Sequence, residues 1–378
     1  MTLYIRSTNK WVFKGIKVQS LLGTNNNKQA LVSVTDQGAS LPTSDIILEN
    51  MQVSSADSIV GWTQAQMVAQ FRNYGILAKG ANTNCVSVTN SHMMNMVFGA
   101  GVFANNMLFS GNEIDRFGDD GIDYAASNIL IAKNYIHDDL DLRIGAHMDG
   151  MQGYPGVSSN VVIDSNRVIR QTDPNLPFPT YLQGIDAFDG DWTNLTVTNN
   201  VVVTTACWGI FFSSVHNGKI INNTVVADNL MPAPGNCKPL VVVGDKTHQG
   251  PSSSDNIIRN NIANGLSIYN LVPNMTMDHN ICLGINGKCQ IVTFVNGKPN
   301  WGVYKPGEYA DHNIIDRRGA EGMFVAFDPA KFVYDLRLRP GARAIGAGNP
   351  AEAPPVDFKG AARAGRVDVG AYQRGSDK

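Results

Sequence analysis

The feature that most constrains the fold is a pair of asparagines six residues apart that recurs along the chain. Spaced apolar residues lie between the two asparagines, and an apolar residue lies two places after the second. The clearest copies begin at Asn106, Asn128, Asn160, Asn194, Asn217 and Asn274. Asparagine tolerates the left-handed backbone of a sharp corner, and its amide can bond to the copies above and below it. The fixed spacing therefore predicts a column of asparagines at one corner of a stacked fold.

The distances between copies vary, with separations of 22, 32, 34 and 23 residues from Asn106 to Asn217. A helical solenoid holds its period more tightly, whereas a β-solenoid accepts loops of different length between short strands. The composition agrees, because glycine accounts for 37 of 378 residues and charged residues for only 16%. We therefore expect an all-β solenoid.

Charge and hydropathy exclude several classes of protein. The net charge is −2, with 30 basic and 32 acidic residues, which argues against a whole-surface binder of nucleic acid or anionic membranes. The sequence has no run of eighteen apolar residues, so we expect no membrane span. The start MTLYIRSTNKW lacks the features of a signal peptide, and its strand-like pattern indicates a mature or truncated chain.

The chain has five cysteines and no Cys-x-x-Cys pair, which excludes a zinc ribbon and a thioredoxin-like site. Cys282 and Cys289 are close enough in sequence to bridge a loop. Buried free thiols are the alternative, and we favour them because free cysteine behaves as a small apolar residue.

A second column of similar segments accompanies the asparagine repeat. They read YGIL, AGVF, DGID, DGMQ, QGID and WGIF, starting at Tyr74, Ala100, Asp120, Asp149, Gln183 and Trp208. The glycine of each marks a bend into a strand, and the next residue is apolar and should point inward. The residue after that should point outward by strand alternation. These outward positions are Leu77, Phe103, Asp123, Gln152, Asp186 and Phe211.

Polar residues replace apolar ones in the middle of this column, over the DGID, DGMQ and QGID segments. Adjacent turns lie ~4.8 Å apart. Carboxylates stacked at that spacing repel, so Asp123, Asp149 and Asp186 persist most easily if they bind a cation, share a proton or perform chemistry. Carboxylates and amides that could bind sugar hydroxyls, and aromatic rings that could stack on sugar faces, are expected at the same level along the axis of the stack. They are Asp120, Gln152, Tyr154, Gln183, Phe188, Asp189, Trp192, Trp208 and Phe211.

These repeats resemble the right-handed parallel β-helix superfamily, which includes pectate-lyase-like polysaccharide lyases, glycoside hydrolases and C5-epimerases. The resemblance covers residues 1–315 and implies a single-stranded right-handed parallel β-helix that carries the catalytic site. Residues 316–378 resemble the closing segment of secreted bacterial β-helix proteins, and we expect an irregular cap packed on the helix. The resemblance implies a secreted or periplasmic protein with a polysaccharide substrate. The sequence is compatible with a monomer and with a homo-oligomer.

The segment HMDGMQ, from His147 to Gln152, resembles a His-x-Asp-Gly-x-Gln pattern of β-helix epimerases and related glycan-active proteins. The resemblance implies that His147, Asp149 and Gln152 lie where the sugar reacts. Arg143 is close by in sequence. We therefore take His147, Asp149, Asp123, Asp186 and Arg143 as the candidate catalytic residues.

Three reactions fit such a site. The leading prediction is β-elimination of a uronic-acid polysaccharide, with His147 or Arg143 as the base and Tyr154 as the proton donor. The negative charge of the sugar carboxylate would be neutralised in one of two ways. Either Ca²⁺ binds to Asp123, Asp149 and Asp186, or Gln152 and a protonated aspartate bind the sugar carboxylate directly. Inverting hydrolysis by an aspartate pair is the alternative, because Asp123 and Asp186 would stand ~9.6 Å apart by strand spacing. C5-epimerisation and a non-catalytic glycan-binding or tailspike-like module complete the set.

Overall fold

The computed structural model describes residues 2–21, 29–142, 147–231, 238–244, 253–268, 274–284, 290–295, 298–303 and 312–374. Contacts within the chain define two units. The first unit comprises Met1–Val161 and Ile169–Leu182, and the second comprises Val162–Val168 and Gln183–Lys378. The expected division at residue 315 stays a prediction.

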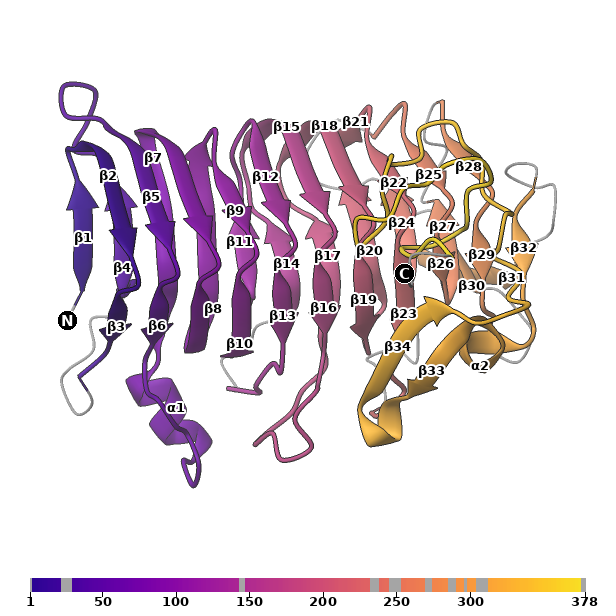
Figure 1. Cartoon of the computed structure of the whole chain (residues 1–378), viewed down its shortest axis with the longest axis horizontal. Helices are drawn as coiled ribbons and strands as arrows, with labels where there is room; N and C mark the ends of the chain where they lie inside the picture. The colour runs from indigo at the N-terminus through magenta and orange to yellow at the C-terminus, as the bar shows by residue number, and fades with distance from the viewer. Residues whose placement is uncertain are drawn as a thin grey trace. The chain divides into compact units, whose positions relative to one another are not determined.

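The first unit is a stack of short parallel strands in three columns (Figure 1). The first column contains β1 (Leu3–Arg6), β4 (Val32–Thr35), part of β7 (Arg72–Thr89), part of β8 (His92–Asn105), β11 (Ile122–Tyr124) and β14 (Asp149–Gly153). The second contains β2 (Asn9–Lys14), β5 (Thr43–Glu49), the rest of β7, β9 (Leu108–Ser110) and β12 (Ile129–Ala132). The third contains β3 (Lys17–Gln19), β6 (Gln52–Ser54), the rest of β8, β10 (Glu113–Phe117) and β13 (Tyr135–His137).

The second unit repeats this arrangement. Its first column contains β17 (Gln183–Ala187), β20 (Trp208–Ser213), β24 (Leu240–Gly244), β27 (Gly265–Ile268) and β30 (Gln290–Val295). The second contains β18 (Asp191–Thr198), β21 (Val215–His216), β22 (Lys219–Ile221), β25 (Ile257–Arg259) and β28 (Thr276–Asp278). The third contains β19 (Val201–Thr204), β23 (Thr224–Ala227), β26 (Ile262–Ala263), β29 (Ile281–Cys282) and β32 (Ile314–Ile315). β15 (Val157–Asp164) and β16 (Arg167–Ile169) include residues of both units.

The predicted asparagine column is confirmed and consists of two ladders. The first asparagine of each copy has a positive φ, for example 58° at Asn128, and the exposed Asn160 amide donates to Asn128 Oδ1 at 2.9 Å. The second asparagine is buried. Asn200 Nδ2 donates to Asn223 Oδ1 at 3.0 Å, and Asn223 Nδ2 donates to Asn261 Oδ1 at 3.0 Å. Each buried amide thereby satisfies the hydrogen-bonding groups of the backbone at the corner, which explains the fixed spacing.

One short helix, α1 (Gln64–Gln70), lies outside the strand columns of the first unit. Its start is fixed by a capping box between Thr63 and Gln66. Met67 is fully buried in an apolar cluster with Phe71, Leu140, Leu142, Leu176 and neighbours. No described helix has the length and apolar character needed to cross a membrane.

The C-terminal segment of the second unit departs from the parallel repeat. β31 (Lys298–Val303) pairs antiparallel with β30. After the helix α2 (Gly319–Met323), the strands β33 (Phe324–Asp328) and β34 (Val333–Leu338) form an antiparallel pair joined by the 3-10 turn η2 (Pro329–Lys331).

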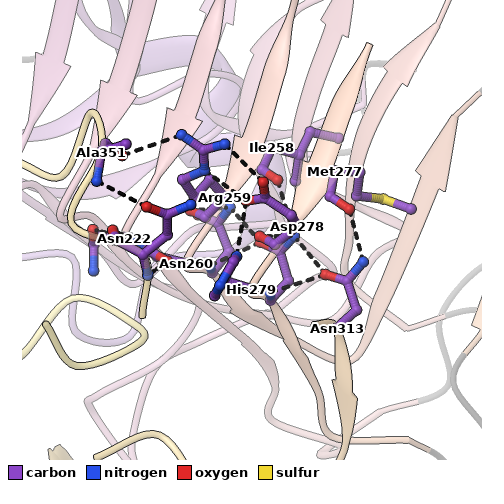
Figure 2. A network of polar contacts seen from close by, with 12 residues as sticks. Asn222, Ile258, Arg259, Asn260, Met277, Asp278, His279, Asn313 and Ala351 are labelled. Carbon is purple, nitrogen blue, oxygen red and sulfur yellow. Dashed lines mark hydrogen bonds and ion pairs between the residues drawn. The ribbon is translucent and has the colours of Figure 1, made fainter. Parts of the chain in front are cut away.

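The residues after β34 lie against the asparagine corner of the second unit. Figure 2 shows Arg259, which holds Asp278 through two bonds of 2.6 and 2.7 Å and donates to the carbonyl of Ala351 at 3.2 Å. Asn260 Nδ2 donates to the Asn349 carbonyl at 2.8 Å. The corner amides therefore fasten this segment along the side of the strand stack.

Among the described cysteines, Cys207 and Cys282 each take part in a disulfide, and Cys85 is free and exposed. The preferred prediction of buried free thiols is therefore wrong for Cys282. Cys237 and Cys289 lie outside the described residues.

Candidate active site

The candidate site lies on the first strand column of the first unit, over β11 and β14. The two strands are in register, with Asp123 opposite Gln152 and Ile122 opposite Met151. Glycine is required at the bend before β11, because a Cβ on Gly121 would lie 2.6 Å from the carbonyl oxygen of Gly150. This close backbone approach brings the residues on either side of the bend together across the two turns.

The predicted column alignment holds at DGID and DGMQ but is wrong by two residues at AGVF. Ile122 of β11 is paired with Ala100, so the glycine equivalent to Gly121 is Gly99. The outward neighbour of Asp123 in that turn is therefore Gly101. The segment GAGVF contains two glycines, and pattern matching selected the second one.

Asp149 is the centre of a hydrogen-bond network. Its backbone N–H donates to Asp120 Oδ1 at 3.0 Å. In the amide orientation that satisfies both of its ends, Gln152 donates to Asp149 Oδ2 at 2.8 Å and to Asp120 Oδ2 at 3.3 Å. His147 Nδ1 lies 3.0 Å from the same Asp149 Oδ2. The four predicted site residues Asp120, His147, Asp149 and Gln152 are thus brought together.

Asp123 is held from its other side by an unpredicted residue. The Tyr74 hydroxyl donates to Asp123 Oδ2 at 2.5 Å. Asp123 Oδ1 is buried and meets no donor among the groups that the structure describes, unless a carboxyl carries a proton. A hydrogen bond between the Asp120 and Asp123 carboxyls affects the pKa of both. One proton shared by this pair satisfies the buried oxygen.

Burial dominates the electrostatics of the cluster. Burial and then the charges of Asp149 and Asp123 raise the pKa of Asp120 far above its usual range. Burial raises the pKa of Asp123 to about 7, against the hydrogen bond from Tyr74. Burial and the charge of Asp149 raise the pKa of Asp119 to about 7. The cluster therefore holds protons near neutral pH.

His147 differs from the carboxyls in both pKa and exposure. Its hydrogen bond with Asp149 raises the pKa of the imidazole. The His147 side chain is 62% exposed, whereas that of Asp149 is 2% exposed. Asp120 and Asp123 are also buried. His147 and the partly exposed Asp119, Tyr74 and Tyr154 are therefore accessible from solvent, whereas the carboxylates of Asp120, Asp123 and Asp149 are buried.

Aromatic side chains accompany the candidate site of the first unit. Tyr154 packs edge-on against Phe103 with ring centroids 5.8 Å apart, and Tyr74 stacks on Phe98 at 4.9 Å. Burial and the charges of the aspartates raise the pKa of the Tyr154 hydroxyl, which keeps its proton at neutral pH. The candidate set omitted Tyr74 and Asp119. Tyr74 opens the segment YGIL, which contains no carboxylate, and Asp119 could not be distinguished from an ordinary turn residue.

The other predicted residues belong to the second unit. Gln183 and Asp186 are buried on β17, where Asp186 pairs in register with Phe211 of β20. Phe188, Trp208 and Phe211 form an aromatic cluster, with centroids 4.6 Å apart for Phe188 and Phe211. Phe188, Asp189 and Trp208 are partly exposed and therefore accessible from solvent.

Two predicted substrate contacts are corrected. Trp192 is fully buried and donates its indole N–H to the carbonyl of Asp189 at 3.0 Å, so it cannot stack on a sugar. Phe211 is 2% exposed and supports Phe188 and Trp208 from beneath. The sequence pattern predicted that these two side chains point outward, but it could not show that other side chains cover them.

The predicted metal site finds no support in the geometry. Within the described part of the chain, no group of three or more His, Cys, Asp or Glu side chains is arranged to hold a metal ion. Asp123 and Asp149 lie in the first unit, and Asp186 lies in the second. Arg143 falls outside the described residues.

A match to a family model agrees with the fold. The family model of the right-handed β-helix region matches residues 74–248. The crystal structure of pectate lyase Pel9A is 12% identical with a TM-score of 0.47, and the match covers 99% of this chain and 96% of that one. PfbA, a surface adhesin of Streptococcus pneumoniae, is 10% identical with a TM-score of 0.40 over 83% of this chain and 71% of that one.

The Dettilon tailspike protein is 13% identical with a TM-score of 0.40, and the match covers 82% of this chain. The chain spans 61% of the tailspike's length. No curated protein matches the sequence. The matched family model, the parallel strand columns and the corner ladders agree, and the chain therefore has the fold of a right-handed parallel β-helix.

Proposed function

We propose that the chain is a secreted lyase that cleaves a uronic-acid-containing polysaccharide by β-elimination at the site around His147. The observation that carries the proposal is the pairing of an exposed imidazole with a buried carboxylate. The His147 side chain is 62% exposed and the Asp149 side chain is 2% exposed, and His147 Nδ1 lies 3.0 Å from Asp149 Oδ2. A buried carboxylate behind a histidine fixes the ring orientation and increases its basicity. The exposed ring nitrogen, Nε2, is then free to meet a substrate proton.

Residues of the site can supply both the base and the proton donor that the elimination needs. Neutral His147 removes the C5 proton of the uronate, the electron pair forms the C4–C5 double bond, and the C4–O bond breaks. Tyr154 keeps its proton because its pKa is raised, and it can give this proton to the leaving oxygen. The proton taken by His147 returns to solvent, and the tyrosine is reprotonated by water.

The negative charge of the uronate needs a partner. Asp119 is partly exposed, and its pKa of about 7 leaves it protonated over part of the neutral range. A protonated carboxyl donates a hydrogen bond to a substrate carboxylate, which lowers the cost of removing the adjacent proton. The neighbouring Asp120–Asp123 pair shares a proton, which limits the repulsion that an anionic glycan would meet.

Inverting hydrolysis is the second candidate, and the pKa of Asp119 favours it. A carboxyl that is protonated near pH 7 can act as the general acid of glycoside cleavage. Elimination ranks first because the predicted partner carboxylates, Asp123 and Asp186, are 0% and 1% exposed. Buried carboxylates cannot activate water on a sugar without a large rearrangement.

An extracellular location accords with the cysteines. Cys207 and Cys282 are disulfide-bonded, and structural disulfides are typical of oxidising compartments. The expected partner is the polysaccharide, without nucleic acid or membrane.

The test follows two signals in one assay. Purified protein is incubated with acidic and neutral polysaccharides, with Ca²⁺ and with chelator, while ultraviolet absorbance and reducing ends are recorded. Elimination gives reducing ends together with new absorbance from the conjugated double bond. Reducing ends without absorbance support hydrolysis instead. If neither signal appears with folded protein, the epimerase and binding-module alternatives take precedence.

A further inference from the structure

A cavity of about 730 Å³ lies in the second unit. Three stretches of chain line it: the turn after β23, the start of α2 with the residue before it, and the end of β33 with the start of η2. We call it the hairpin cavity. Its lining includes Asp228, Leu230, Arg318, Glu321, Phe327 and Asp328. Its volume is within the range of about 300–1,000 Å³ that is usual for small-molecule sites. His147 and Asp149 belong to the first unit, so the hairpin cavity uses different residues from the candidate active site.

Arg318 presents a fixed guanidinium at one wall of the cavity. Asp316, whose side chain is 2% exposed, accepts Arg318 Nε at 3.1 Å and Arg318 Nη2 at 2.8 Å. Two bonds to one carboxylate fix the plane of the guanidinium. The Arg318 side chain is nevertheless 47% exposed, and its Nη1 donates to the Gly341 carbonyl at 3.4 Å. Because a guanidinium has more N–H groups than these bonds use, it keeps donors for an acceptor in the cavity.

Carboxylates form other parts of the lining. Asp228 is buried, and its Oδ1 accepts the Thr205 hydroxyl at 3.1 Å and the backbone N–H of Leu230 at 3.2 Å. These bonds hold the carboxylate in place after the end of β23. Glu321 is exposed on α2, and Asp328 is half-buried at the end of β33. The cavity therefore combines one guanidinium with three carboxylates, each carried by a different part of its lining.

Phe327 supplies an aromatic surface to the same cavity. It is paired with Tyr334 in the antiparallel register of β33 and β34. Its ring packs against those of Phe324 and Tyr334, with centroids 6.2 and 6.1 Å away. Phe327 is only half-buried, so part of its surface is accessible. A ring that is held by two neighbours offers an apolar surface to a ligand at little entropic cost.

The lining of the cavity favours one chemical class of ligand. Carboxylates accept hydrogen bonds from hydroxyl groups, a guanidinium donates to hydroxyl or ring oxygens, and an aromatic ring packs against the C–H face of a sugar. A purely apolar ligand would remove water from the charged groups without replacing its hydrogen bonds. An anionic sugar is disfavoured as well, because carboxylates outnumber cations among the lining residues. A neutral sugar satisfies all of these groups.

We propose that the hairpin cavity is a second glycan-binding site, which takes neutral sugar units of an oligosaccharide or polysaccharide. The inference goes beyond the proposed function, because it concerns other residues and another class of sugar. Together the two sites suit a polysaccharide that contains both acidic and neutral units, since the first unit would act on the uronates and the second would bind the neutral sugars.

Calorimetry with neutral oligosaccharides tests the site directly. Cellohexaose, mannohexaose and maltohexaose are titrated into the wild type, Phe327→Leu and Glu321→Ala. Phe327→Leu keeps an apolar side chain but removes the aromatic face, and Glu321→Ala removes one acceptor from an exposed position. Each variant should bind at least one of these probes about tenfold more weakly than the wild type. Val325→Ala is the matched control and should bind normally, because Val325 is a 48% exposed residue of the same strand that lies outside the lining.

The same titrations separate this inference from the proposed reaction. Both variants should keep kcat and KM for a short oligogalacturonate within about twofold, and weaker binding of a neutral probe supports the site even if the wild type shows no turnover. Unchanged affinity in both variants, or no binding of any of the three neutral probes, would overturn the proposal. Oligogalacturonate binding that is weakened by Phe327→Leu would overturn the assignment to neutral sugars.

Hydrogen exchange locates the bound sugar. With a saturating neutral probe, the amides of Phe327, Asp328 and Ala330 should exchange more slowly, while those of β11 in the first unit should not change. Slower exchange in β11 without any change at the hairpin cavity would contradict the location. If Phe327→Leu loosens the antiparallel pair even without a ligand, the exposed Glu321→Ala variant decides the comparison of affinities.

Discussion

The imidazole of His147 stands 3.0 Å from the carboxylate of Asp149, with the histidine exposed and the aspartate buried. The same Asp149 oxygen also accepts the Gln152 amide at 2.8 Å. Two donors on one buried oxygen fix the carboxylate, and the carboxylate in turn orients the ring. The pair therefore gives this acidic site a base that reaches solvent, which the buried aspartates cannot supply.

Removal of the exposed base should abolish turnover without unfolding the protein. His147→Ala should lower kcat by roughly 10²- to 10⁴-fold, the usual contribution of a general base. Asp149→Asn should lower it by a similar factor, because the amide no longer holds the ring in the productive orientation. Thermal unfolding should change little for His147→Ala, since the side chain is 62% exposed. His312→Ala, at an exposed histidine of the second unit, is the control. A fully active His147→Ala variant would mean that the site is misplaced.

The pH–rate profile should be bell-shaped. The rate rises with pH as His147 loses its proton, at a pKa raised above the usual 6.5 by Asp149. It falls as pH passes about 7, because Asp119 then ionises and no longer donates to the substrate carboxylate. Asp119→Asn keeps an N–H donor that does not titrate, so it should remove the alkaline fall. The same bell in that variant would exclude Asp119 from the role.

The buried asparagine ladder should contribute to stability and not to chemistry. Asn134 Nδ2 donates to the Phe109 carbonyl at 3.0 Å, and Asn134 Oδ1 accepts the backbone N–H of Asn112 at 2.9 Å. Asn134→Ala leaves these buried groups unsatisfied and should cost about 3 kcal/mol in denaturant unfolding. Asn128→Gly is the control, because Asn128 is exposed at φ 58° and glycine accepts that backbone. Equal losses in the two variants would contradict the ladder.

Stability should fall at high pH because of His137. Burial lowers its pKa, but hydrogen bonds to Asp138 and Glu113 and the charge of Asp115 raise it to about 9. A folded-state pKa above the unfolded 6.5 means that the stabilisation is complete below about pH 6.5 and is lost as pH rises through about 9. The loss should be roughly 3 kcal/mol and absent in His137→Gln. Chemical unfolding at pH 6 and pH 10 measures it, and an equal fall in both proteins would rule out this histidine as the cause.

The fold could be predicted because the residues that form the corner of each turn recur along the sequence. Every turn needs the same corner, so the left-handed asparagine and the buried amide recur at a fixed spacing. The glycine at the bend was also visible, since the backbone of the next turn approaches too closely for a Cβ at Gly121. The error at AGVF arose because Gly99 and Gly101 both fit the pattern, and only pairing with Ile122 distinguishes them.

The site could be predicted only in part. Strand alternation placed Asp123 and Gln152 on one face, and the register confirms that they are opposite each other. Burial could not be read from the pattern, because it depends on side chains such as Tyr74 that reach across from other turns. The same limit explains Trp192, whose indole is buried in its own turn.

The most direct test of the account is the mass of the products released from a uronic-acid polysaccharide by the wild type and by His147→Ala. If His147 is the base of an elimination, the wild type should release unsaturated oligosaccharides, each lighter by one water than a hydrolysis product, and the variant should release none. Saturated oligosaccharides from the wild type, or unsaturated ones from His147→Ala, would contradict the claim that His147 is the base of an elimination.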